Sequence, residues 1–182
     1  MNVIEKIQAR AKSLQKTILL PEGTEERTVQ AAAKAAKEGL AKVKLIGVAD
    51  EVKAVAKKVG ADLSKVEILD PATDSRRDRF VSALFEMRKA KGMTEEQAAK
   101  LMLDPMHFAA MAVKDDQSEA DGYVAGARNA TSDVWRPALQ IIKPKPGLKT
   151  CSSNFLMVLP KGSPFGEDGA LMYADCGLVI NP

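Results

Sequence analysis

Apolar residues in the first part of the chain follow two different patterns. Those at positions 3, 4, 7, 11 and 14 recur at helical spacing, which predicts an amphipathic first helix. Short continuous apolar runs, typical of buried strands, follow at residues 17–20, 43–46 and 66–69. Helix signals lie between these runs, at residues 25–38 before Gly39, and from a capping Asp50 to Val59 before Gly60. Three alternations of this kind predict an α/β fold, with a mostly parallel sheet and helices on both of its faces.

A helical stretch follows the third of these strands. Residues 75–78 have the spacing of a capping box, with aspartate in place of the usual glutamate, and Gly92 ends the helix that they begin. A second capping box is predicted from Thr94 to Gln97. Asp104-Pro105 predicts the N-cap and first turn of a further helix that extends to about residue 113.

The last third of the chain contains a break in the pattern. Residues 122–125 are typical of another buried strand, and the cluster of Pro144, Pro146 and Gly147 marks the expected domain boundary. We therefore expect an N-terminal α/β domain over residues 1–147 and the first strands of a second α/β domain over residues 148–182. Within the latter, residues 153–159 and 171–180 are strand-like and are joined by a glycine-rich loop, which predicts a hairpin.

The apolar run at residues 177–180 comes directly before the last two residues of the sequence. A strand in that place has nothing after it to cover it, whereas strands of parallel sheets are usually covered by helices. This predicts that the sequence is a truncated piece of a longer protein. The alternative is a natural or designed stop, with the strand at a sheet edge.

Composition narrows the class of protein. Of 182 residues, 46% are hydrophobic and 28% charged, which is ordinary for a globular protein. The 27 Lys and Arg against 24 Asp and Glu give a net charge of +3, too balanced to indicate nucleic-acid binding, and the aromatic fraction of 4% argues against base stacking. No apolar run is long enough to span a membrane, and the charged start does not resemble a signal peptide. We expect a cytoplasmic protein with no membrane or nucleic-acid partner.

The residues that most often bind metals are few. Cys151 and Cys176 are far apart and fit no metal or redox spacing, and His107 is the single histidine. We expect no metal site, and a structural role for His107 within its helix. The basic run of Arg76, Arg77 and Arg79 alternates with acids, so it is expected to form a solvated helix face with local ion pairs.

The segment from residue 121 to residue 137 passes from a strand through a polar loop into a helix. Ligands of open α/β sheets bind where strand ends meet helix starts, and free backbone N–H groups there favour an anion. The loop supplies a glycine, small polar side chains and two arginines suited to phosphate: Gly126, Arg128, Asn129, Thr131, Ser132 and Arg136. The alternative is that Thr131 or Ser132 only caps the helix and Arg136 is a solvated residue. Pro137 leaves open whether the helix begins near Ser132 or near Arg136.

This segment also resembles a known family. Residues 125–133, followed by Arg136-Pro137 and residues 138–143, are similar to the central signature of phosphate acetyltransferases (phosphotransacetylases). The resemblance extends over the whole chain, and its other segments are residues 17–23 with Glu26-Arg27, residues 84–92, residues 152–157, and residues 173–176 with Asn181-Pro182. It identifies the chain as the N-terminal portion of such a protein. The implied fold has two α/β domains of the phosphotransacetylase and isocitrate-isopropylmalate dehydrogenase type, with the active site between them.

The resemblance implies an acyltransferase activity: reversible transfer of acetyl between acetyl-CoA and inorganic phosphate, giving acetyl phosphate and coenzyme A. In the implied mechanism the coenzyme A thiolate attacks acetyl phosphate directly within a ternary complex. Coenzyme A is then a substrate, no cofactor is permanently bound, and the complete protein is a homodimer.

The resemblance also assigns residues. Arg88 and Arg136 match arginines that contact coenzyme A or phosphate. Thr131 and Ser132 are expected to line the phosphate pocket, and Asn129 and Arg128 to lie beside them. The family's catalytic base is expected in a C-terminal half that this sequence lacks, so the chain alone is expected to be inactive.

Three alternatives remain open at this stage. Phosphate butyryltransferases share parts of the pattern, so the acyl group is less certain than the reaction. The chain could also be a non-catalytic half that binds coenzyme A or phosphate and needs a complementary chain. A plain α/β domain with another ligand, such as a nucleotide, is disfavoured because the usual nucleotide-binding motifs are absent.

Overall fold

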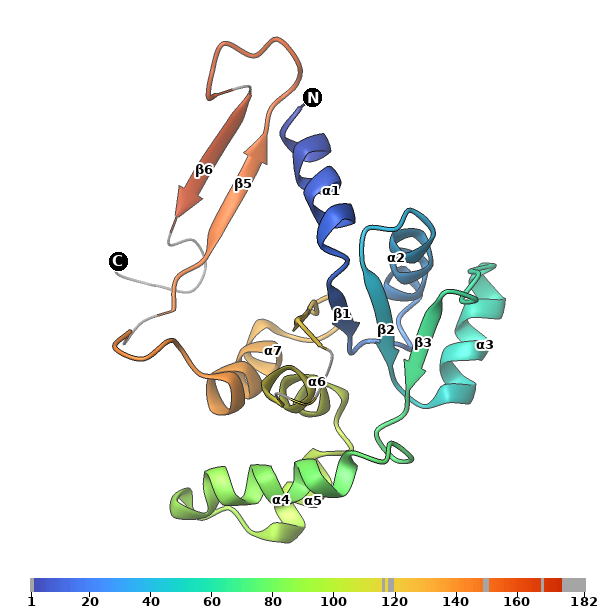
Figure 1. The fold of residues 1–182 in the computed structure, drawn as a ribbon, viewed down its shortest axis with the longest axis vertical. Helices are drawn as coiled ribbons and strands as arrows, with labels where there is room; N and C mark the ends of the chain where they lie inside the picture. The colour runs from blue at the N-terminus through green and yellow to red at the C-terminus, as the bar shows by residue number, and fades with distance from the viewer. Residues whose placement is uncertain (1, 116, 118–119, 149–150, 168, 175–182) are drawn as a thin grey trace. The chain divides into compact units, whose positions relative to one another are not determined.

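A computed structural model describes residues 2–174 apart from residues 116, 118–119, 149–150 and 168 (Figure 1). In chain order its elements are α1 (Val3–Leu14), β1 (Thr17–Leu20), α2 (Glu26–Lys37), β2 (Lys42–Ile46), α3 (Ala49–Val59), β3 (Val66–Leu69), α4 (Arg77–Arg88), the 3-10 turn η1 (Lys89–Lys91), α5 (Glu95–Leu101), α6 (Pro105–Lys114), β4 (Gly122–Tyr123), α7 (Thr131–Pro137), the π-helical turn η2 (Ala138–Ile142), β5 (Asn154–Val158) and β6 (Ala170–Ala174). The chain divides into two compact units, Leu14–Lys143 and a second that combines Met1–Ser13 with Pro144–Pro182. The domain limits expected at residues 147 and 148 stay a prediction.

The unit Leu14–Lys143 is built on a four-stranded sheet with the order β3-β2-β1-β4. Every pair in this sheet is parallel, with Leu19 opposite Lys44 on one side and opposite Tyr123 on the other. The three strands expected at residues 17–20, 43–46 and 66–69 are confirmed. The strand expected at residues 122–125 is shorter than predicted, because only Gly122–Tyr123 pairs with β1 before the chain turns away.

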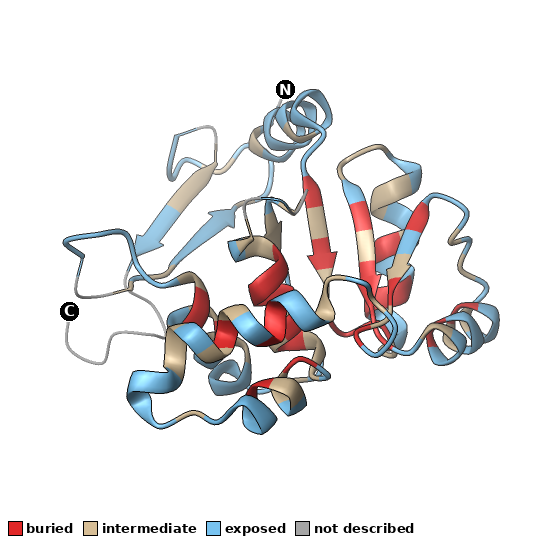
Figure 2. Ribbon diagram, turned by 60° about the horizontal axis from the view of Figure 1, so that its bottom comes forward, coloured by how far each residue is buried: buried red, intermediate tan, exposed pale blue. Residues whose placement is uncertain are grey.

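Helices cover both faces of this sheet, which confirms the expected α/β fold. On one face Val43, Leu45 and Val66 pack with buried residues of α2 and α3. On the other face, strand residues at alternate positions join a second cluster with α4, α5, α6 and η2. Figure 2 shows buried residues gathered on the strands and on α6, whose middle is buried almost throughout.

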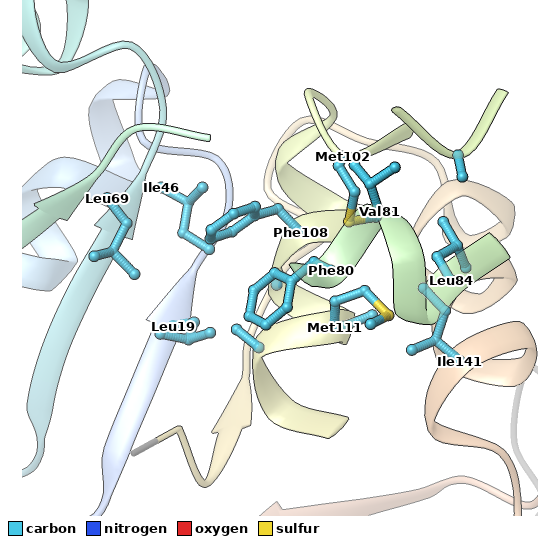
Figure 3. Close-up of a cluster of buried hydrophobic side chains, with 14 residues drawn as sticks. Leu19, Ile46, Leu69, Phe80, Val81, Leu84, Met102, Phe108, Met111 and Ile141 are labelled. Carbon is cyan, nitrogen blue, oxygen red and sulfur yellow. The ribbon is translucent and has the colours of Figure 1, made fainter. Parts of the chain in front are cut away.

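The second cluster centres on two aromatic rings. Phe80 of α4 and Phe108 of α6 are each 1% exposed or less, and their centroids lie 5.3 Å apart with the planes tilted by 60°. Figure 3 shows both rings between the strand residues Leu19, Ile46 and Leu69 and the methionines of the helical layer. These rings therefore join the α4–α6 layer to the sheet.

The basic run at the start of α4 forms the expected local ion pairs, but it is not uniformly solvated. Arg76 binds Asp74 through two nitrogens, at 2.8 and 2.6 Å, and its guanidinium lies 5.9 Å from the centroids of both Phe80 and Phe108. Arg79 pairs with Asp115 at 2.6 Å. Arg76 is thus half-buried against the aromatic pair, where a cation over a ring face is favourable.

Two of the predicted helix starts are confirmed. Thr94 and Gln97 form both bonds of the capping box at the start of α5. Asp104 caps α6 by accepting the His107 N–H at 3.0 Å, and its carboxylate also lies 2.5 Å from His107 Nδ1. His107 therefore has the structural role that its sequence context predicts.

Two other predicted caps are wrong. Val48, not Asp50, occupies the N-cap position of α3, and the first N–H, from Ala49, is bound at 3.2 Å by Asp70 from a later loop. The capping box expected over residues 75–78 is also absent. Asp74 accepts the Arg76 N–H at 2.9 Å, so the start of α4 is organised by a turn one residue earlier than the predicted box.

The second unit contains the predicted hairpin. β5 and β6 pair antiparallel, with Leu156 opposite Met172 at the centre. The part of the second strand expected after residue 174 lies outside the described residues. The amphipathic first helix is also confirmed as α1, yet it has no buried residue. Both elements keep large apolar side chains exposed, among them Ile7, Phe155 and Met172.

The aromatic pair gives a first stability test. We expect Phe108→Ala to lower the free energy of unfolding by about 3–5 kcal/mol, because it removes a fully buried ring and leaves a cavity between α6 and the sheet. Urea denaturation followed by circular dichroism measures the change. Leu103→Ala, at a position that is 48% exposed just before α6, is the control and should cost less than about 1 kcal/mol. Equal losses in both variants would contradict this account of the core.

A second test concerns the turn after β1. Gly23 donates its N–H to the Ile46 carbonyl at 3.1 Å, and a Cβ at Gly23 would lie 2.6 Å from that same oxygen. We therefore expect Gly23→Ala to destabilise the fold by about 1–3 kcal/mol, since a backbone atom cannot move aside easily. In Gly122→Ala the nearest atom to the new Cβ is 4.0 Å away, so this variant should match the unmodified protein in the same thermal melt.

Candidate functional site

The strand order creates a switch point beside β1. The chain runs from β1 to β2 and β3 on one side, and later returns to β4 on the other side of β1. In open α/β sheets, ligands bind at the carboxyl ends of the strands at such a point. The turn that follows β1, at residues 21–25, and the loop that follows β4, at residues 124–130, meet there. The loop singled out from the sequence therefore lies where the fold favours a ligand.

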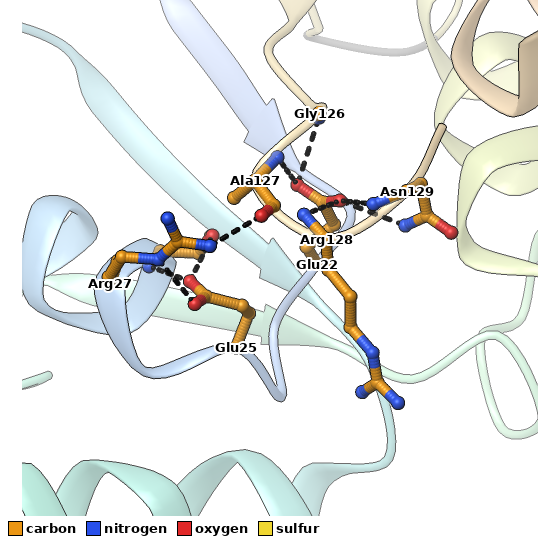
Figure 4. A network of polar contacts seen from close by, with 8 residues as sticks. Glu22, Glu25, Arg27, Gly126, Ala127, Arg128 and Asn129 are labelled. Atoms are coloured by element: carbon orange, nitrogen blue, oxygen red, sulfur yellow. Dashed lines mark hydrogen bonds and ion pairs between the residues drawn. The ribbon is translucent and has the colours of Figure 1, made fainter. Parts of the chain in front are cut away.

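A buried carboxylate organises this loop. Glu22 is 6% exposed, and Figure 4 shows its side chain surrounded by residues 126–129. Its Oε2 accepts the N–H groups of Gly126 at 3.0 Å and Ala127 at 2.8 Å. Its Oε1 accepts those of Arg128 and Asn129, both at 2.8 Å, and the Asn129 side-chain amide at 2.9 Å. The expectation that these backbone N–H groups are free is thus wrong, because the anion that they bind is a carboxylate of the protein itself.

These hydrogen bonds also control the protonation of Glu22. Burial alone would raise the pKa of its carboxyl group, because a charged group loses solvation. The N–H donors of Asn129, Arg128 and Ala127, together with the Asn129 amide, stabilise the charged form and outweigh that effect, so the pKa lies below its ordinary value. Glu22 is therefore ionised at neutral pH.

A second contact holds the same loop from α2. Arg27 donates from Nη2 to the Ala127 carbonyl, and from Nε to Glu25 Oε1 at 2.7 Å. Glu25 in turn caps α2 by accepting the Thr28 N–H at 2.8 Å. Gly126 has a φ of +104°, which side chains rarely adopt, so a glycine suits this point of the loop. The loop is thus fastened to both the turn after β1 and the first turn of α2.

The helix after this loop begins near Ser132, the first of the two starts considered from the sequence, and not near Arg136. α7 starts at Thr131, and Ala130 at the N-cap makes no side-chain bond, so neither Thr131 nor Ser132 acts as the cap. The hydroxyl of Tyr123 donates to the Val134 carbonyl at 3.0 Å and ties the helix to β4. Burial raises the pKa of Tyr123, so its hydroxyl keeps the proton that it donates.

The exposed side of α7 carries the polar side chains expected to bind an anion. Ser132 and Arg136 are four residues apart and therefore share a face, with Thr131 beside them. All three are exposed, whereas Pro137 is buried, as is Ile141 in η2. Within the described chain, the guanidinium groups of Arg128 and Arg136 are exposed and make no ion pair. Two unpaired arginines and the hydroxyl of Thr131 are donors of the kind suited to a phosphate-type anion, and the hydroxyl of Ser132 donates to Asp133 Oδ1 at 3.4 Å.

Five of the six predicted site residues lie within residues 128–136, which form the end of the loop after β4 and the helix α7. The sixth, Arg88, is the last residue of α4. Both α4 and α7 pack against α6, so α6 connects the two helices that carry Arg88 and Arg136. Arg88 is half-buried, and its Nε is buried without a hydrogen-bond partner in the described part of the chain. Which ligand these six residues contact stays a prediction.

Sequence reasoning missed the roles of Glu22, Arg27 and Tyr123. A signal for Glu22 is present in the sequence, because an acid two residues after a buried strand needs several donors if it stays inside. Residues 126–129 are where those donors lie, but the sequence alone does not reveal the pairing. The roles of Arg27 and Tyr123 depend on contacts between segments far apart in the chain.

Metal and membrane sites are not indicated among the described residues. No group of three or more His, Cys, Asp and Glu side chains in this part of the chain could hold a metal ion. Cys151 is a half-buried free thiol, and Cys176 lies outside the described residues. None of the described helices is long and apolar enough to cross a membrane.

The lowered pKa of Glu22 gives a prediction with a definite sign. The unfolded chain binds the Glu22 proton near the ordinary pKa of about 4.3, and the folded protein binds it only at lower pH. The stability that the carboxylate contributes is therefore complete above about pH 5 and is lost as pH falls through the folded pKa. We expect Glu22→Gln to cost roughly 2–4 kcal/mol at pH 7, because its amide would place N–H donors against N–H donors.

The measurement is urea denaturation of both proteins at pH 7 and near pH 3.5. The stability difference between them should shrink at the lower pH. Glu26→Gln is the matched control, because Glu26 forms an exposed pair with Lys58 and should change stability by less than about 1 kcal/mol. A difference that stays constant with pH would show that the charge of Glu22 is not what binds the loop.

Comparison with known proteins identifies the family. The family described as Phosphate acetyl/butaryl transferase matches residues 2–182. The Phosphate acetyltransferase of Acetivibrio thermocellus is 47% identical over 182 residues, which are 100% of this chain and 53% of that protein. The Phosphate acetyltransferase of Clostridium acetobutylicum is 44% identical over 182 residues, which are 100% of this chain and 54% of that protein. The chain spans about half the length of each of these two relatives.

Solved structures agree with the sequence matches. The EutD phosphotransacetylase from Staphylococcus aureus aligns with a TM-score of 0.82 and 33% identity, over 100% of this chain and 53% of that one. A phosphotransacetylase from Streptococcus pyogenes aligns with a TM-score of 0.86 and 35% identity, over 100% of this chain and 54% of that one. The resemblance seen in the sequence is therefore confirmed, and the chain belongs to the Phosphate acetyl/butaryl transferase family.

Proposed function

We propose that the protein transfers an acetyl group reversibly between acetyl-CoA and inorganic phosphate, giving acetyl phosphate and coenzyme A. The observation that carries this proposal is the identity of 44–47% to relatives named Phosphate acetyltransferase, over the full length of the chain. The group of exposed donors on α7 supports it, because inorganic phosphate is a substrate in one direction of the reaction and acetyl phosphate is a substrate in the other. Coenzyme A acts as a substrate, and no permanently bound cofactor is part of the proposal.

In the proposed reaction the coenzyme A thiolate attacks the carbonyl carbon of acetyl phosphate. The new C–S bond forms, the C–O bond to phosphate breaks, and phosphate leaves as an anion. Arg128 and Arg136 counter the charge that develops on that leaving group, with the hydroxyls of Thr131 and Ser132 as further donors. Arg88 is assigned to the binding of coenzyme A or phosphate.

The base that takes the thiol proton is not Glu22. Both of its oxygens already accept hydrogen bonds, and its pKa is lowered, so it binds a proton less readily than an ordinary carboxylate. A free thiol ionises near pH 8.5, so a weak base is enough to activate it. We propose that this base comes from the part of the relatives' length that this chain does not span. We also propose a cytoplasmic protein that works as a homodimer.

A longer acyl group is the second candidate. The family description names both acetyl and butaryl transferases, and the sequence does not identify residues that fix the length of the acyl chain. Parallel assays with acetyl-CoA and butyryl-CoA separate the two activities. Acetyl transfer predicts a higher kcat/KM for acetyl-CoA, and the reverse order would favour the second candidate.

The test joins this chain to the part of the Acetivibrio thermocellus relative that it does not cover, and follows thioester formation from acetyl phosphate and coenzyme A. We expect the chimera to be active, and Arg136→Ala to lower kcat/KM about a hundredfold because it removes a donor from the developing charge. Arg10→Ala, at an exposed position of α1, is the control and should stay within about twofold. Full activity of Arg136→Ala, or no thioester formation by the unmodified chimera, would contradict the proposal.

A further inference from the structure

The shape of the loop at residues 126–129 depends on a side chain. These residues belong to no helix or strand, and the four consecutive N–H groups converge on the carboxylate of Glu22. The carboxylate is 6% exposed, and the Gly23 N–H bonded to Ile46 fixes the turn from which it extends. Since a rigid turn presents the carboxylate, the geometry of the loop depends on the position of β1 as well as on loop residues such as Gly126 and Asn129.

The same contacts decide what is left to bind a ligand. The backbone donors of residues 126–129 and the Asn129 amide are already occupied, so they are not available to an arriving phosphate. The donors that remain are exposed side chains and the first N–H groups of α7, which have no acceptor within the helix. These donors lie within or directly after the fixed residues. Arg128 has its own N–H bonded to Glu22 at 2.8 Å, and Thr131 begins α7 two residues after Asn129. The directions in which these side chains leave the backbone are therefore set by the carboxylate.

The charge of Glu22 also needs to be balanced, because an anion site above a bare carboxylate would repel phosphate. Five N–H donors surround the carboxylate and disperse its charge, and the nearby Arg27 binds the Ala127 carbonyl on the same loop. The guanidinium groups of Arg128 and Arg136 stay exposed for an external anion. The buried charge thus organises the loop without occupying the exposed arginines.

We propose that Glu22 is a positioning residue for the phosphate group of the substrate, because it fixes the loop from which the anion-binding donors extend. This inference rests on the proposed function. Without the carboxylate the loop samples other shapes, and the apparent affinity for phosphate falls in proportion to the fraction of molecules that keep the competent one. Coenzyme A, a larger ligand with contacts elsewhere, is affected less.

The experiment has two readouts. In the chain itself, amide hydrogen exchange at residues 126–129 reports on the loop. In the chimera described above, the KM values for inorganic phosphate and for coenzyme A are measured in opposite directions of the reaction. Glu22→Gln removes the charge at constant size, and Glu22→Asp keeps the charge on a side chain one methylene shorter. Glu26→Gln is the matched control on α2, with an exposed carboxylate paired to Lys58.

We expect Glu22→Gln to speed exchange of the four amides at least tenfold and to raise the KM for phosphate at least tenfold, with the KM for coenzyme A changed less than threefold. Glu22→Asp should recover part of both effects, and Glu26→Gln should show neither. If Glu22→Gln does not fold, the test rests on Glu22→Asp alone. A KM for phosphate in Glu22→Asp equal to that of the unmodified chimera would then overturn the inference.

Two other results would also overturn it. Unchanged exchange of the four amides in Glu22→Gln would show that the carboxylate does not hold the loop. An equal rise in both KM values would show a general loss of structure rather than positioning of the phosphate. Failure of the proposed function would give a different result. The unmodified chimera would then form no thioester, but Glu22→Gln would still speed amide exchange at residues 126–129 in the chain.

Discussion

The parallel pairing of β1 on both of its edges is the constraint on which the rest of the unit Leu14–Lys143 depends. Because β2 and β4 both run in the direction of β1, the turn after β1 and the loop after β4 end at the same edge of the sheet. Residues 104 positions apart in the sequence, Glu22 and Gly126, thereby come within hydrogen-bond distance. This contact fixes the loop that leads into α7. It therefore also fixes the place of the donors on the exposed side of that helix.

Much of this fold could be predicted from the pattern of apolar residues. The strands at residues 17–20, 43–46 and 66–69 are short apolar runs between helices, and burial on both faces of a parallel sheet requires such runs. The predicted caps succeeded where a side chain bonds within its own turn, as Thr94 does. One failed because the partner is distant, as with Asp70 and α3. The other failed because a local turn at Asp74, one residue before the predicted box, organises the start of α4. A bond to a later loop is not visible in a sequence, and the exact residue that caps a helix is only partly visible.

The candidate site also has a part that the sequence predicts and a part that it does not. The donors on α7 lie close together in the sequence, so their residue types alone suggested a phosphate-binding segment. Glu22 gave only a weak signal, because four of its five donors are backbone groups and a backbone N–H has no residue identity. The sequence favoured a loop with free N–H groups at residues 126–129. In the structure these groups bind the carboxylate of Glu22, so they are not free to bind a ligand. Arg88 lies on α4, which is why pattern reasoning alone could not relate it to α7.

The exposed hairpin has a consequence for handling the protein in solution. β5 and β6 present Phe155, Met157 and Tyr173 to solvent on one face, and Leu156 and Met172 on the other. A two-stranded ribbon of this kind is a template on which another copy can add a strand, and apolar side chains on both faces strengthen such contacts. At high concentration the chain should tend to self-associate through these residues. Solubility would then be limited by the hairpin, while the unit Leu14–Lys143, which contains Glu22 and α7, stays folded.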